Sequence, residues 1–321
     1  MARPSVVTSS PATSDFVPER GGPLRLTKRR RGRPPLVRNW ALLLPALLFL
    51  GVFSIYPMVE LVRMSVSEVN VGNLLDRVWP FTGTENYSAI FEDAAFGISV
   101  RNTVILVVVT VVVSIGGGLL AALFLQRETR FNAGVHGIMI FMWALPPLVT
   151  GSIWKFLLST SGPVSGTIQG VTGAPPYLLA DPNLAIWSVT AVVCWASVAF
   201  ASLLMRAGLA QLDPHQTEAA MIDGANRLQL FRFLILPALR PVILVQALLV
   251  VLYSFKTFDF PFVLTNGGPG TASTTLPYLA YTQSFGSLEF GAGSATAVAS
   301  MLVVIAIAAG YLFLSRDEAS Q

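Results

Sequence analysis

The sequence predicts an all-α membrane protein with about six transmembrane helices and one charged insert on the cytoplasmic side. Three observations lead to this fold class. Of the 321 residues, 53% are hydrophobic and only 12% are charged, about half the charged fraction of a soluble domain. Six apolar runs are long enough to cross a bilayer, which takes about 20 residues. Lysine and arginine are distributed unevenly among the segments that connect these runs.

The expected spans lie at about 40–60, 102–125, 135–158, 184–209, 238–264 and 293–314. Each is expected to be a helix, because a helix satisfies its own backbone hydrogen bonds in lipid. Gly116, Gly117 and Gly118 in the second span would let another helix approach closely. The single cysteine, Cys194, falls within the fourth run and is expected to behave as a small buried hydrophobe, so a disulfide within the chain is excluded.

Basic residues orient these spans. Nine of the 21 lysine and arginine residues precede Trp40, among them the cluster "KRRRGR", whereas the connections at about 159–183 and 265–292 contain none. Because cytoplasmic segments are enriched in Lys and Arg, both termini are predicted to be cytoplasmic. The cluster is interpreted as a topological signal that also touches anionic membrane lipid, and no nucleic-acid partner is expected.

Three parts follow from this pattern. Residues 1–39 form a basic, Ser/Thr/Pro-rich tail that is expected to be disordered. Residues 40–315 form the transmembrane domain, and residues 316–321 form a cytoplasmic C-terminal tail. A cleaved signal peptide is not expected, because the first apolar run has no clear small-residue cleavage site.

A charged insert at about 211–240 separates the fourth and fifth spans. Asp213 followed by Pro214 predicts the start of a helix, "HQTEAAMID" continues that helix, and Gly224 allows a sharp turn. "NRLQLFRFLIL" predicts a second helix, which Asp223 could cap through its backbone amides.

Two prolines, Pro237 and Pro241, follow this second helix and mark a further break or the start of the fifth span. The charged side chains of the insert would each cost about 3 kcal/mol at the centre of a bilayer. The insert is therefore predicted to lie on the cytoplasmic face, where its first helix offers small and apolar groups to a partner.

The insert resembles the signature of a known family. The pattern Glu-Ala-Ala, three residues, Gly, nine residues, Ile-x-Leu-Pro is typical of permease subunits of bacterial ATP-binding-cassette (ABC) importers. This chain matches it at Glu218, Ala219, Ala220, Gly224, Leu236 and Pro237, with Leu234 in place of the usual isoleucine. The resemblance implies a type I importer permease fold, in which the first helix of the insert sits in a cleft of a separate ATPase. Asp223 lies within the same stretch and is a further candidate for this coupling.

A second stretch narrows the family. "FDFPFVLTNGGPG", residues 258–270, is similar to the end of the fifth span in carbohydrate permeases, with the string at Thr265, Gly267, Gly268 and Pro269. "FTGTENY" resembles the short element before their second span. The likeness covers about residues 40–315, and it is closer to the first permease subunit of the maltose and glycerol-phosphate type than to that subunit's usual partner, which lacks the Gly-Gly-Pro string. The alternative interpretation of the Gly-Gly-Pro string is a tight turn that leaves a helix.

No residue pattern for chemistry accompanies these spans. Glu60 and Asp259 are the only acidic residues in or at the edge of a span, so neither an ion-coupled carrier nor an intramembrane hydrolase is favoured. No phosphate-binding Gly-x-x-x-x-Gly-Lys-Ser/Thr string is present. We expect a transport subunit that is not an enzyme and holds no cofactor or metal, with ATP and Mg²⁺ on a partner ATPase.

Candidates for the substrate path come from polar and aromatic residues in the spans. Tyr253, Lys256 and Phe260 recur at helical spacing in the fifth span, with Asp259 close to Lys256. Aromatic faces and a few hydrogen-bonding groups suit a sugar. The alternative is that Lys256 and Asp259 pair with each other, or that Lys256 extends toward the membrane surface. Trp154 and Lys155 in the third span are further candidates, or else interfacial anchors.

The resemblance implies an importer of a sugar or oligosaccharide in the bacterial inner membrane. Its expected partners are a second, different permease, two ABC ATPase subunits and an extracellular solute-binding protein. Import of a glycerol-phosphate or polyol is the alternative within the superfamily. A membrane scaffold or sensor without transport is the alternative from another class.

Overall fold

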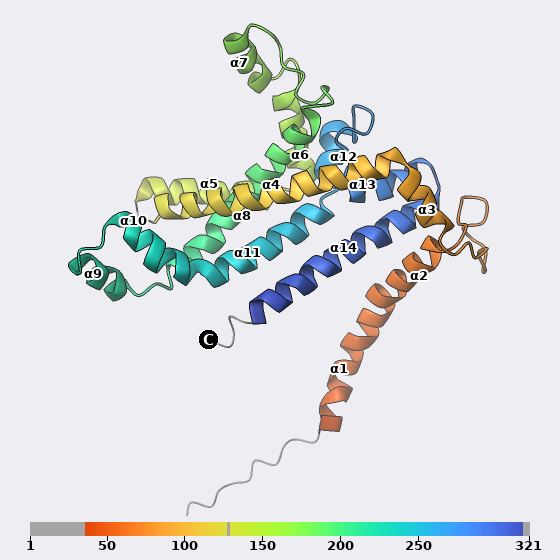
Figure 1. Ribbon diagram of the computed structural model, residues 1–321, viewed down its shortest axis with the longest axis horizontal. Coiled ribbons are helices and arrows are strands. Elements are labelled where there is room, and N and C mark those ends of the chain that lie inside the picture. Colours follow the sequence, from red (N-terminus) through yellow and green to blue (C-terminus); the bar gives the residue numbers. More distant parts are fainter. Residues whose placement is uncertain (1–35, 127–128, 317–321) are drawn as a thin grey trace, which may run out of the picture. The chain divides into compact units, whose positions relative to one another are not determined.

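The computed structural model describes residues 36–126 and 129–316, and in this part the chain is mostly helical (Figure 1). Of the predicted disordered tail, 1–39, residues 1–35 lie outside the described residues, as do residues 317–321; the prediction was wrong for 36–39, which belong to a helix. The chain divides into two units, residues 1–53 and 54–321. The first contains helix α1 (Leu36–Leu50), and a π-helical segment, η1 (Gly51–Ile55), crosses the boundary between the two units.

The second unit contains the remaining helices. In chain order these are α2 (Tyr56–Ser65), α3 (Glu85–Glu92), α4 (Ala94–Phe124), α5 (Arg130–Ala144), α6 (Pro147–Leu158), α7 (Pro163–Thr172), α8 (Ala185–Leu209), α9 (Pro214–Ile222), α10 (Arg227–Leu230), the π-helical η2 (Phe231–Ile235), α11 (Leu236–Lys256), α12 (Asp259–Thr265), α13 (Leu276–Tyr281), the π-helical η3 (Thr282–Gly286) and α14 (Phe290–Arg316). The only β-type pairing among the described residues is an isolated bridge between Ser67 and Phe81.

Five helices are long and apolar enough to cross a membrane. They cover Leu43–Ser65, Ala94–Phe124, Ala185–Leu209, Arg227–Lys256 and Phe290–Tyr311. A sixth crossing exists if the bent pair formed by Arg130–Ala144 and Pro147–Thr172 counts as one span. The predicted all-α class is confirmed, and the predicted six spans correspond to these five helices and the bent pair.

The third predicted span was wrong as a single helix. α5 and the segment that follows it are bent by 105°. The bend falls at Leu145, which is extended with ψ 135°, and at Pro146 with ψ 137°. Proline cannot donate a helical hydrogen bond, and it biases the residue before it toward an extended backbone. Two consecutive prolines, Pro146 and Pro147, therefore interrupt the helix here.

The fifth predicted span was also wrong as one helix. It begins within the insert, runs without a break past Pro237 and Pro241 and ends at Lys256. Thr257 is extended (ψ 110°), and α12 then starts afresh at Asp259. η2 ends at Ile235, and α11 begins at Leu236 with Pro237, which has no N–H to donate, in its first turn. Pro237 thus lies in the first turn of α11, as predicted for the start of the span, and Pro241 lies inside that helix without breaking it.

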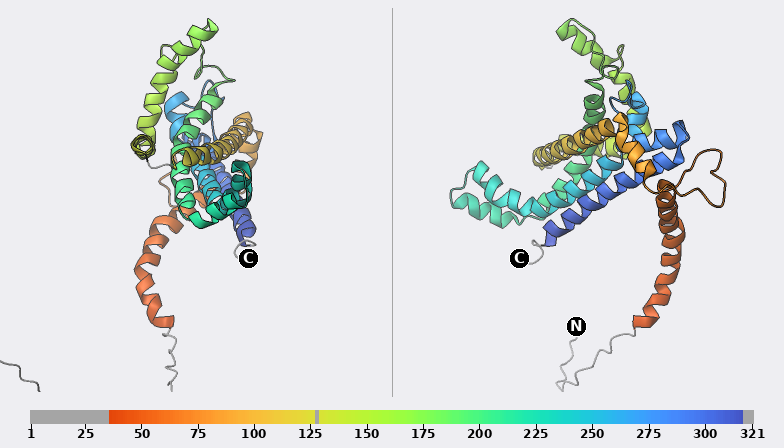
Figure 2. Two further views of the ribbon diagram at one scale, coloured as in Figure 1. Left: turned by 90° about the vertical axis from the view of Figure 1, so that its left-hand side faces the viewer. Right: turned by 45° about the vertical axis from the view of Figure 1, so that its right-hand side comes forward.

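The bundle is built around close packing of α4 on α8, which lie side by side (Figures 1 and 2). A Cβ on Gly118 would collide with Ala201 and its backbone, and one on Gly117 would come within 3.0 Å of Val198. The prediction of close helix contact is therefore confirmed for Gly117 and Gly118. Gly116 faces open space and takes no part in it.

Two apolar clusters lie at different levels of this bundle. The one nearer the insert contains Leu119, Ala122, Met205, Leu209 and Leu239. The other, nearer α12, contains Leu106, Leu158, Val189, Val192, Val193, Phe260 and Leu264. Each such fully buried large side chain contributes about 1.5–3 kcal/mol. Figure 1 places α9 and α10 at one end of this unit and α12 and α13 at the other.

Candidate functional site

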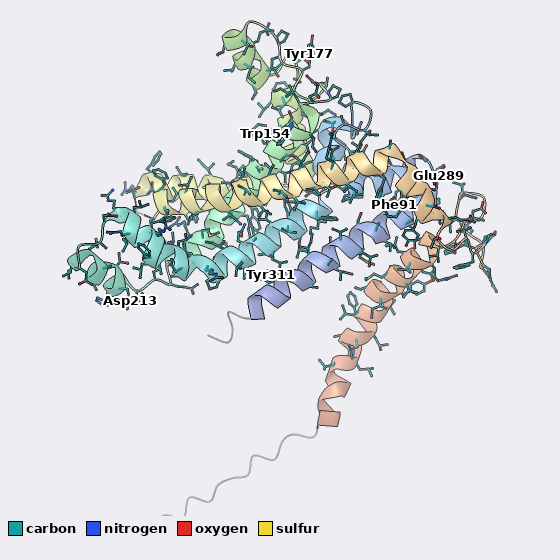
Figure 3. The ribbon with its side chains drawn as sticks, viewed as in Figure 1. Phe91, Trp154, Tyr177, Asp213, Glu289 and Tyr311 are labelled. Atoms are coloured by element: carbon teal, nitrogen blue, oxygen red, sulfur yellow. The ribbon has the colours of Figure 1, made fainter. Side chains whose placement is uncertain are left out.

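The insert begins as the sequence predicts. The Asp213 carboxylate accepts a hydrogen bond of 2.9 Å from the backbone N–H of His215, and Pro214 occupies the first turn of α9. Figure 3 shows Asp213 where α9 starts. This cap satisfies one of the backbone donors that every helix start leaves free. The residues from Asp213 onward are thus set to form a short, separate helix.

A glycine ends α9. Gly224 has φ +86°, its N–H donates to the carbonyl of Met221 at 3.1 Å, and the N–H of Ala225 donates to the carbonyl of Ala220 at 3.0 Å. This is the Schellman arrangement, in which a left-handed residue after the helix closes two hydrogen bonds onto its last turn. Glycine adopts that conformation without the steric cost that a side chain brings. The turn reverses the chain directly after the Glu-Ala-Ala segment.

The second helix of the insert has its own cap. The N–H of Gln229 donates to the side chain of Asn226 at 2.9 Å, and the N–H of Asn226 donates to the side chain of Gln229 at 2.8 Å. This reciprocal pair is a capping box. The prediction that Asp223 caps the second helix was wrong. Asp223 is the C-cap residue of α9, and the N-cap residue of α10 is Asn226, three residues later.

α9 has no buried residue. Met221 and Ile222 at its end are 55% and 86% exposed, and Phe233 beyond the turn is 72% exposed. Glu218 is also exposed, with a carboxylate oxygen 3.8 Å from Nδ1 of His215. A hollow of about 420 Å³ separates the two arms of the insert; it is lined by Ala220, Asp223, Gly224, Ala225, Gln229, Leu230, Phe233 and Leu234. Within the described residues, no other part of the chain covers the apolar side chains of α9 or the hollow beside it.

The turn that contains the Gly-Gly-Pro string lies at the other end. Asn266 and Gly267 have φ of 50° and 75°, and the Gly268–Pro269 peptide bond is cis. A Cβ on Gly267 would collide with the ring of Tyr278, so no other residue fits without movement. Burial raises the pKa of the Tyr278 hydroxyl.

Side chains of the turn bond to its own backbone. The hydroxyls of Thr265 and Ser273 lie 2.7 Å apart, and Ser273 donates to the carbonyl of Gly268 at 2.8 Å. Thr274 donates to the carbonyl of Gly267 at 3.0 Å. Ser273 and Thr274 are buried. The tight turn considered as the alternative interpretation of this string is present.

The start of α4 holds the same turn from outside. The amide of Asn102 donates to the carbonyls of Ala272 and Thr274 at 2.9 and 3.0 Å. The hydroxyl of Thr103 accepts from the N–H of Leu276 at 2.9 Å. Asn102 is fully buried. The turn is thus fixed to the second span by buried hydrogen bonds.

Hydrogen bonds also fix the "FTGTENY" element, through its residues Asn86 and Tyr87. The amide of Asn86 donates to the carbonyls of Ser65 and Ser67 at 3.0 and 2.9 Å. The hydroxyl of Tyr87 lies 2.8 Å from that of Ser65. Asn86 and Tyr87, two residues of the stretch that resembles the family, therefore bond α3 to the end of α2.

A cavity of about 520 Å³ opens at the α5–α6 bend. Its wall comes from α5, α6, α8, α11 and α12 and comprises Met142, Trp143, Ala144, Leu145, Pro146, Pro147, Thr150, Ala196, Ser197, Phe200, Leu249, Val250, Tyr253 and Phe260. Trp143 stacks on Phe200 with ring centroids 5.3 Å apart. The hydroxyl of Ser197 is buried and has no hydrogen-bond partner. The cavity therefore offers aromatic faces, few hydroxyl groups and no charge.

Two of the predicted substrate-path residues line this cavity and four do not. Tyr253 and Phe260 are part of the wall, although the break at Thr257 separates them onto α11 and α12. Lys256 is exposed, Asp259 is half-buried, and among the described residues no ion pair joins them. The alternative in which these two side chains pair is therefore not observed.

Trp154 and Lys155 lie away from the cavity. Trp154 packs edge-on against Trp195 at 5.4 Å and borders the apolar cluster nearer α12. Figure 3 shows it on α6, beyond the bend. Lys155 is exposed. Sequence reasoning missed Trp143, Ser197 and Phe200, which the bend brings together; the Pro146–Pro147 pair was the signal available for it.

The described residues contain no group of three or more His, Cys, Asp or Glu side chains that could hold a metal ion. An apolar bundle, an uncovered helix on a charged insert and an uncharged central cavity together define a class. They define a helical, membrane-spanning subunit with a cavity between its spans and an insert whose first helix is left uncovered within the described residues.

Comparison with known proteins gives the family. Residues 114–317 match the family "Binding-protein-dependent transport system inner membrane component". The chain is 30% identical to the sulfoquinovosyl glycerol transport system permease protein of Agrobacterium fabrum over 86% of this chain and 90% of the relative. It is 29% identical to the trehalose/maltose transport system permease protein of Thermococcus litoralis, over 87% and 93%. It is 30% identical to the sn-glycerol-3-phosphate transport system permease protein of Agrobacterium fabrum, over 86% and 94%.

A solved structure shows the same fold. A bacterial ABC transporter involved in the import of alginate superposes with a TM-score of 0.75 at 19% identity, covering 88% of this chain and 96% of the solved chain. The chain belongs to the family of inner-membrane components of binding-protein-dependent transport systems. It is a multi-pass permease subunit of an ABC importer, and ATP hydrolysis takes place on a separate subunit.

Proposed function

We propose that this permease carries a neutral sugar or oligosaccharide, and that the cavity at the α5–α6 bend is part of its path. The observation that carries the proposal is the wall of the cavity. Trp143, Phe200 and Tyr253 offer ring faces on which the C–H faces of a sugar stack. The unpartnered hydroxyl of Ser197 offers a hydrogen bond that a sugar hydroxyl would complete.

The charge of the substrate distinguishes a neutral sugar from the alternative substrate, a glycerol-phosphate. A phosphate in a cavity of low polarity needs an arginine or lysine beside it. The wall of this cavity contains neither, and Lys256, one turn from Tyr253, is exposed instead of lining it. Relatives in both substrate classes match this chain at similar identity. The uncharged wall therefore favours the sugar.

The insert supports the coupling role. α9 is uncovered, carries exposed Met221 and Ile222, and has a hollow beside it. These features suit a cleft on an ABC ATPase that receives the helix and moves it when ATP and Mg²⁺ close the ATPase pair. Glu218, Ala219, Ala220, Asp223, Gly224, Leu236 and Pro237 would serve this contact. A second permease, two ATPase subunits and a solute-binding protein complete the proposed importer.

Uptake of labelled sugars tests the cavity. Ser197→Ala and Phe200→Leu should each lower the maximal uptake rate, Ser197→Ala by about tenfold for one lost hydrogen bond in the transport step. Ser152→Ala is the matched control, because its exposed hydroxyl bonds only to its own helix. Normal uptake in both cavity variants would contradict the path. A selective loss in Lys256→Ala would move the path to that side chain.

Thiol labelling in intact cells tests the orientation. In a chain with Cys194→Ala, a cysteine at Thr167 should react with a membrane-impermeant maleimide and a cysteine at Gln229 should not. Both positions are exposed, so only sidedness decides the result. Labelling of position 229 from outside would place the insert, and both predicted cytoplasmic termini, on the wrong face.

A further inference from the structure

α5 and α8 meet along a seam that has one side away from the transport cavity. The hydroxyl of Ser202 donates to the sulfur of Met139 at 3.7 Å, and Trp143 stacks on Phe200. Met139 on α5 contacts Ser202 on α8, and Trp143, four residues later on α5, contacts Phe200, which precedes Ser202. The two helices are therefore antiparallel. The N-terminal end of α5 therefore meets the C-terminal end of α8, next to the insert.

A second groove, of about 570 Å³, follows this seam. It is lined by Val109, Val113, Met139, Met142, Trp187, Thr190, Ala191, Cys194, Trp195, Val198 and Ala199. Thr190 donates to the carbonyl of Ile186, and the Cys194 thiol contacts the hydroxyl of Thr110, so both of these polar groups are already engaged. Val113, Trp187 and Ala191 are exposed along it. The groove is thus apolar, open to the side and located within membrane-spanning helices.

A cation and an imidazole lie at the insert end of the same seam. His136 precedes Met139 by one turn, and Arg206 follows Ser202 by one turn, so the antiparallel register brings them together. Arg206 is close enough to act electrostatically on His136. Nδ1 of His136 is buried without a partner, and no carboxylate among the described residues pairs with the half-buried Arg206. A guanidinium without a protein counter-charge is free to form a charge-assisted, bidentate pair with a phosphate.

The apolar groove and the basic end are joined at a distance that fits one leaflet. At 1.5 Å per residue, the lining of the groove on α8 begins at Ala199, about 10 Å from Arg206, passes Cys194 at about 18 Å and continues to Trp187 at about 28 Å. Half of a bilayer's hydrocarbon core is about 15 Å thick. The part of the groove between Arg206 and Cys194 therefore suits a ligand with an anionic head and a chain about as long as a leaflet is deep.

We propose that this seam binds an anionic phospholipid of the cytoplasmic leaflet. Its phosphate accepts hydrogen bonds from the guanidinium of Arg206, and one acyl chain fills the groove beside Cys194. The site is independent of the sugar path, because the groove and the transport cavity lie on opposite sides of the α5–α8 seam and share only Met142.

Native mass spectrometry of the delipidated importer, titrated with phosphatidylglycerol, tests the proposal. Arg206→Gln removes the charge-assisted bond, and Ala191→Phe fills the groove from its exposed side. Each should weaken binding of the first phosphatidylglycerol by about tenfold. Arg101→Gln and Ala207→Phe are the matched controls, an exposed cation and an exposed alanine outside the groove, and should bind as the wild type does.

Two further arms identify the ligand. Phosphatidylcholine should bind more weakly than phosphatidylglycerol, and millimolar inorganic phosphate should not displace the lipid, because it has no chain for the groove. Equal binding by all variants, equal binding of both lipids or displacement by phosphate would overturn the proposal. A wild-type importer that retains no lipid would overturn it too and would indicate that the second permease covers the groove.

A measurement on the unaltered chain covers the case in which a variant fails to fold. Cys194 is the only cysteine of this chain and lines the groove. Its reaction with N-ethylmaleimide, followed by peptide mass in the intact importer, should slow severalfold when phosphatidylglycerol is added after delipidation. An unchanged rate would contradict occupation of the groove.

Discussion

The insert at α9–α10 and the turn at residues 265–276 are both short, glycine-containing connections between apolar helices, and they differ in what surrounds them. In the turn, a Cβ on Gly267 meets Tyr278, and the hydroxyls of Ser273 and Thr274 bond to the turn's own backbone. In the insert, a Cβ on Gly224 would meet nothing within 4 Å, and α9 buries no residue. The turn is completed from within the chain, whereas the insert is left to be completed by a partner. The motif in the buried turn therefore determines the fold, and the motif in the uncovered insert determines an interaction with a partner.

The largest effect is expected at the turn. Gly267→Val would combine a left-handed backbone with a collision, costing about 1–3 kcal/mol for each of these two causes. We expect most of the permease to fail to fold, measured as the yield of monodisperse importer and its thermal unfolding temperature. Gly267→Asn should fail as well, because asparagine tolerates the backbone but still collides. A stable Asn variant would show that packing at Tyr278 is looser than the structure indicates.

Gly224→Val should separate folding from coupling. The strain of about 1–3 kcal/mol falls on an exposed segment, so the bundle should fold while the Schellman turn is lost and α9 is misdirected. The readout is stimulation of ATP hydrolysis by the sugar-loaded binding protein, which should be abolished. Gly224→Asn should retain most of it, since asparagine accepts a positive φ and nothing obstructs its side chain. Normal stimulation in the Val variant would remove the coupling role from this turn.

Ile222→Asp should weaken the partner contact without strain. Ile222 is 86% exposed, so the unfolding free energy should change by less than about 0.5 kcal/mol. Affinity for the ATPase should fall about tenfold or more, as expected for a charge placed in an apolar contact. The control is Val171→Asp on α7, equally exposed at 85% but on the predicted outer side. If both variants bind the ATPase equally well, Ile222 is outside the contact.

The smallest effect concerns the second cap. Asn226→Ala should cost about 1 kcal/mol of local stability and speed hydrogen exchange of the first amides of α10. Asp223→Ala should leave that exchange unchanged, because the side chain that caps α10 is Asn226. The reverse pattern would restore Asp223 as the capping residue.

The sequence predicted well what local chemistry and hydrophobicity decide. The Asp213–Pro214 start and the Gly224 turn follow from backbone preferences, and α8 was placed within one residue because its apolar run is bounded on both sides. The α5–α6 bend and the break at Thr257 were not predicted, although Pro146 and Pro147 were visible. Apolar runs continue across both points, and hydropathy reports the composition of a run but not its direction.

The residues of the candidate site also fall into a group that the sequence predicts and a group that it does not. Glu218 and Gly224 could be found because the insert keeps its motif in one short stretch. The cavity could not be found, because Trp143, Ser197 and Tyr253 come from three helices that meet only through the bend. Lys256 drew attention as a charge in an apolar run, yet the end of α11 leaves it exposed.

Hydrogen–deuterium exchange of the permease subunits, with and without their ATPase subunits, tests the central comparison most directly. The account predicts that amides of residues 214–222 exchange rapidly without the ATPase and become strongly protected with it, since α9 then enters a cleft. Amides of residues 267–276 should be protected to the same degree in both samples. Unchanged exchange in α9 on addition of the ATPase, while the two still co-purify, would contradict the claim that the insert is completed by that partner.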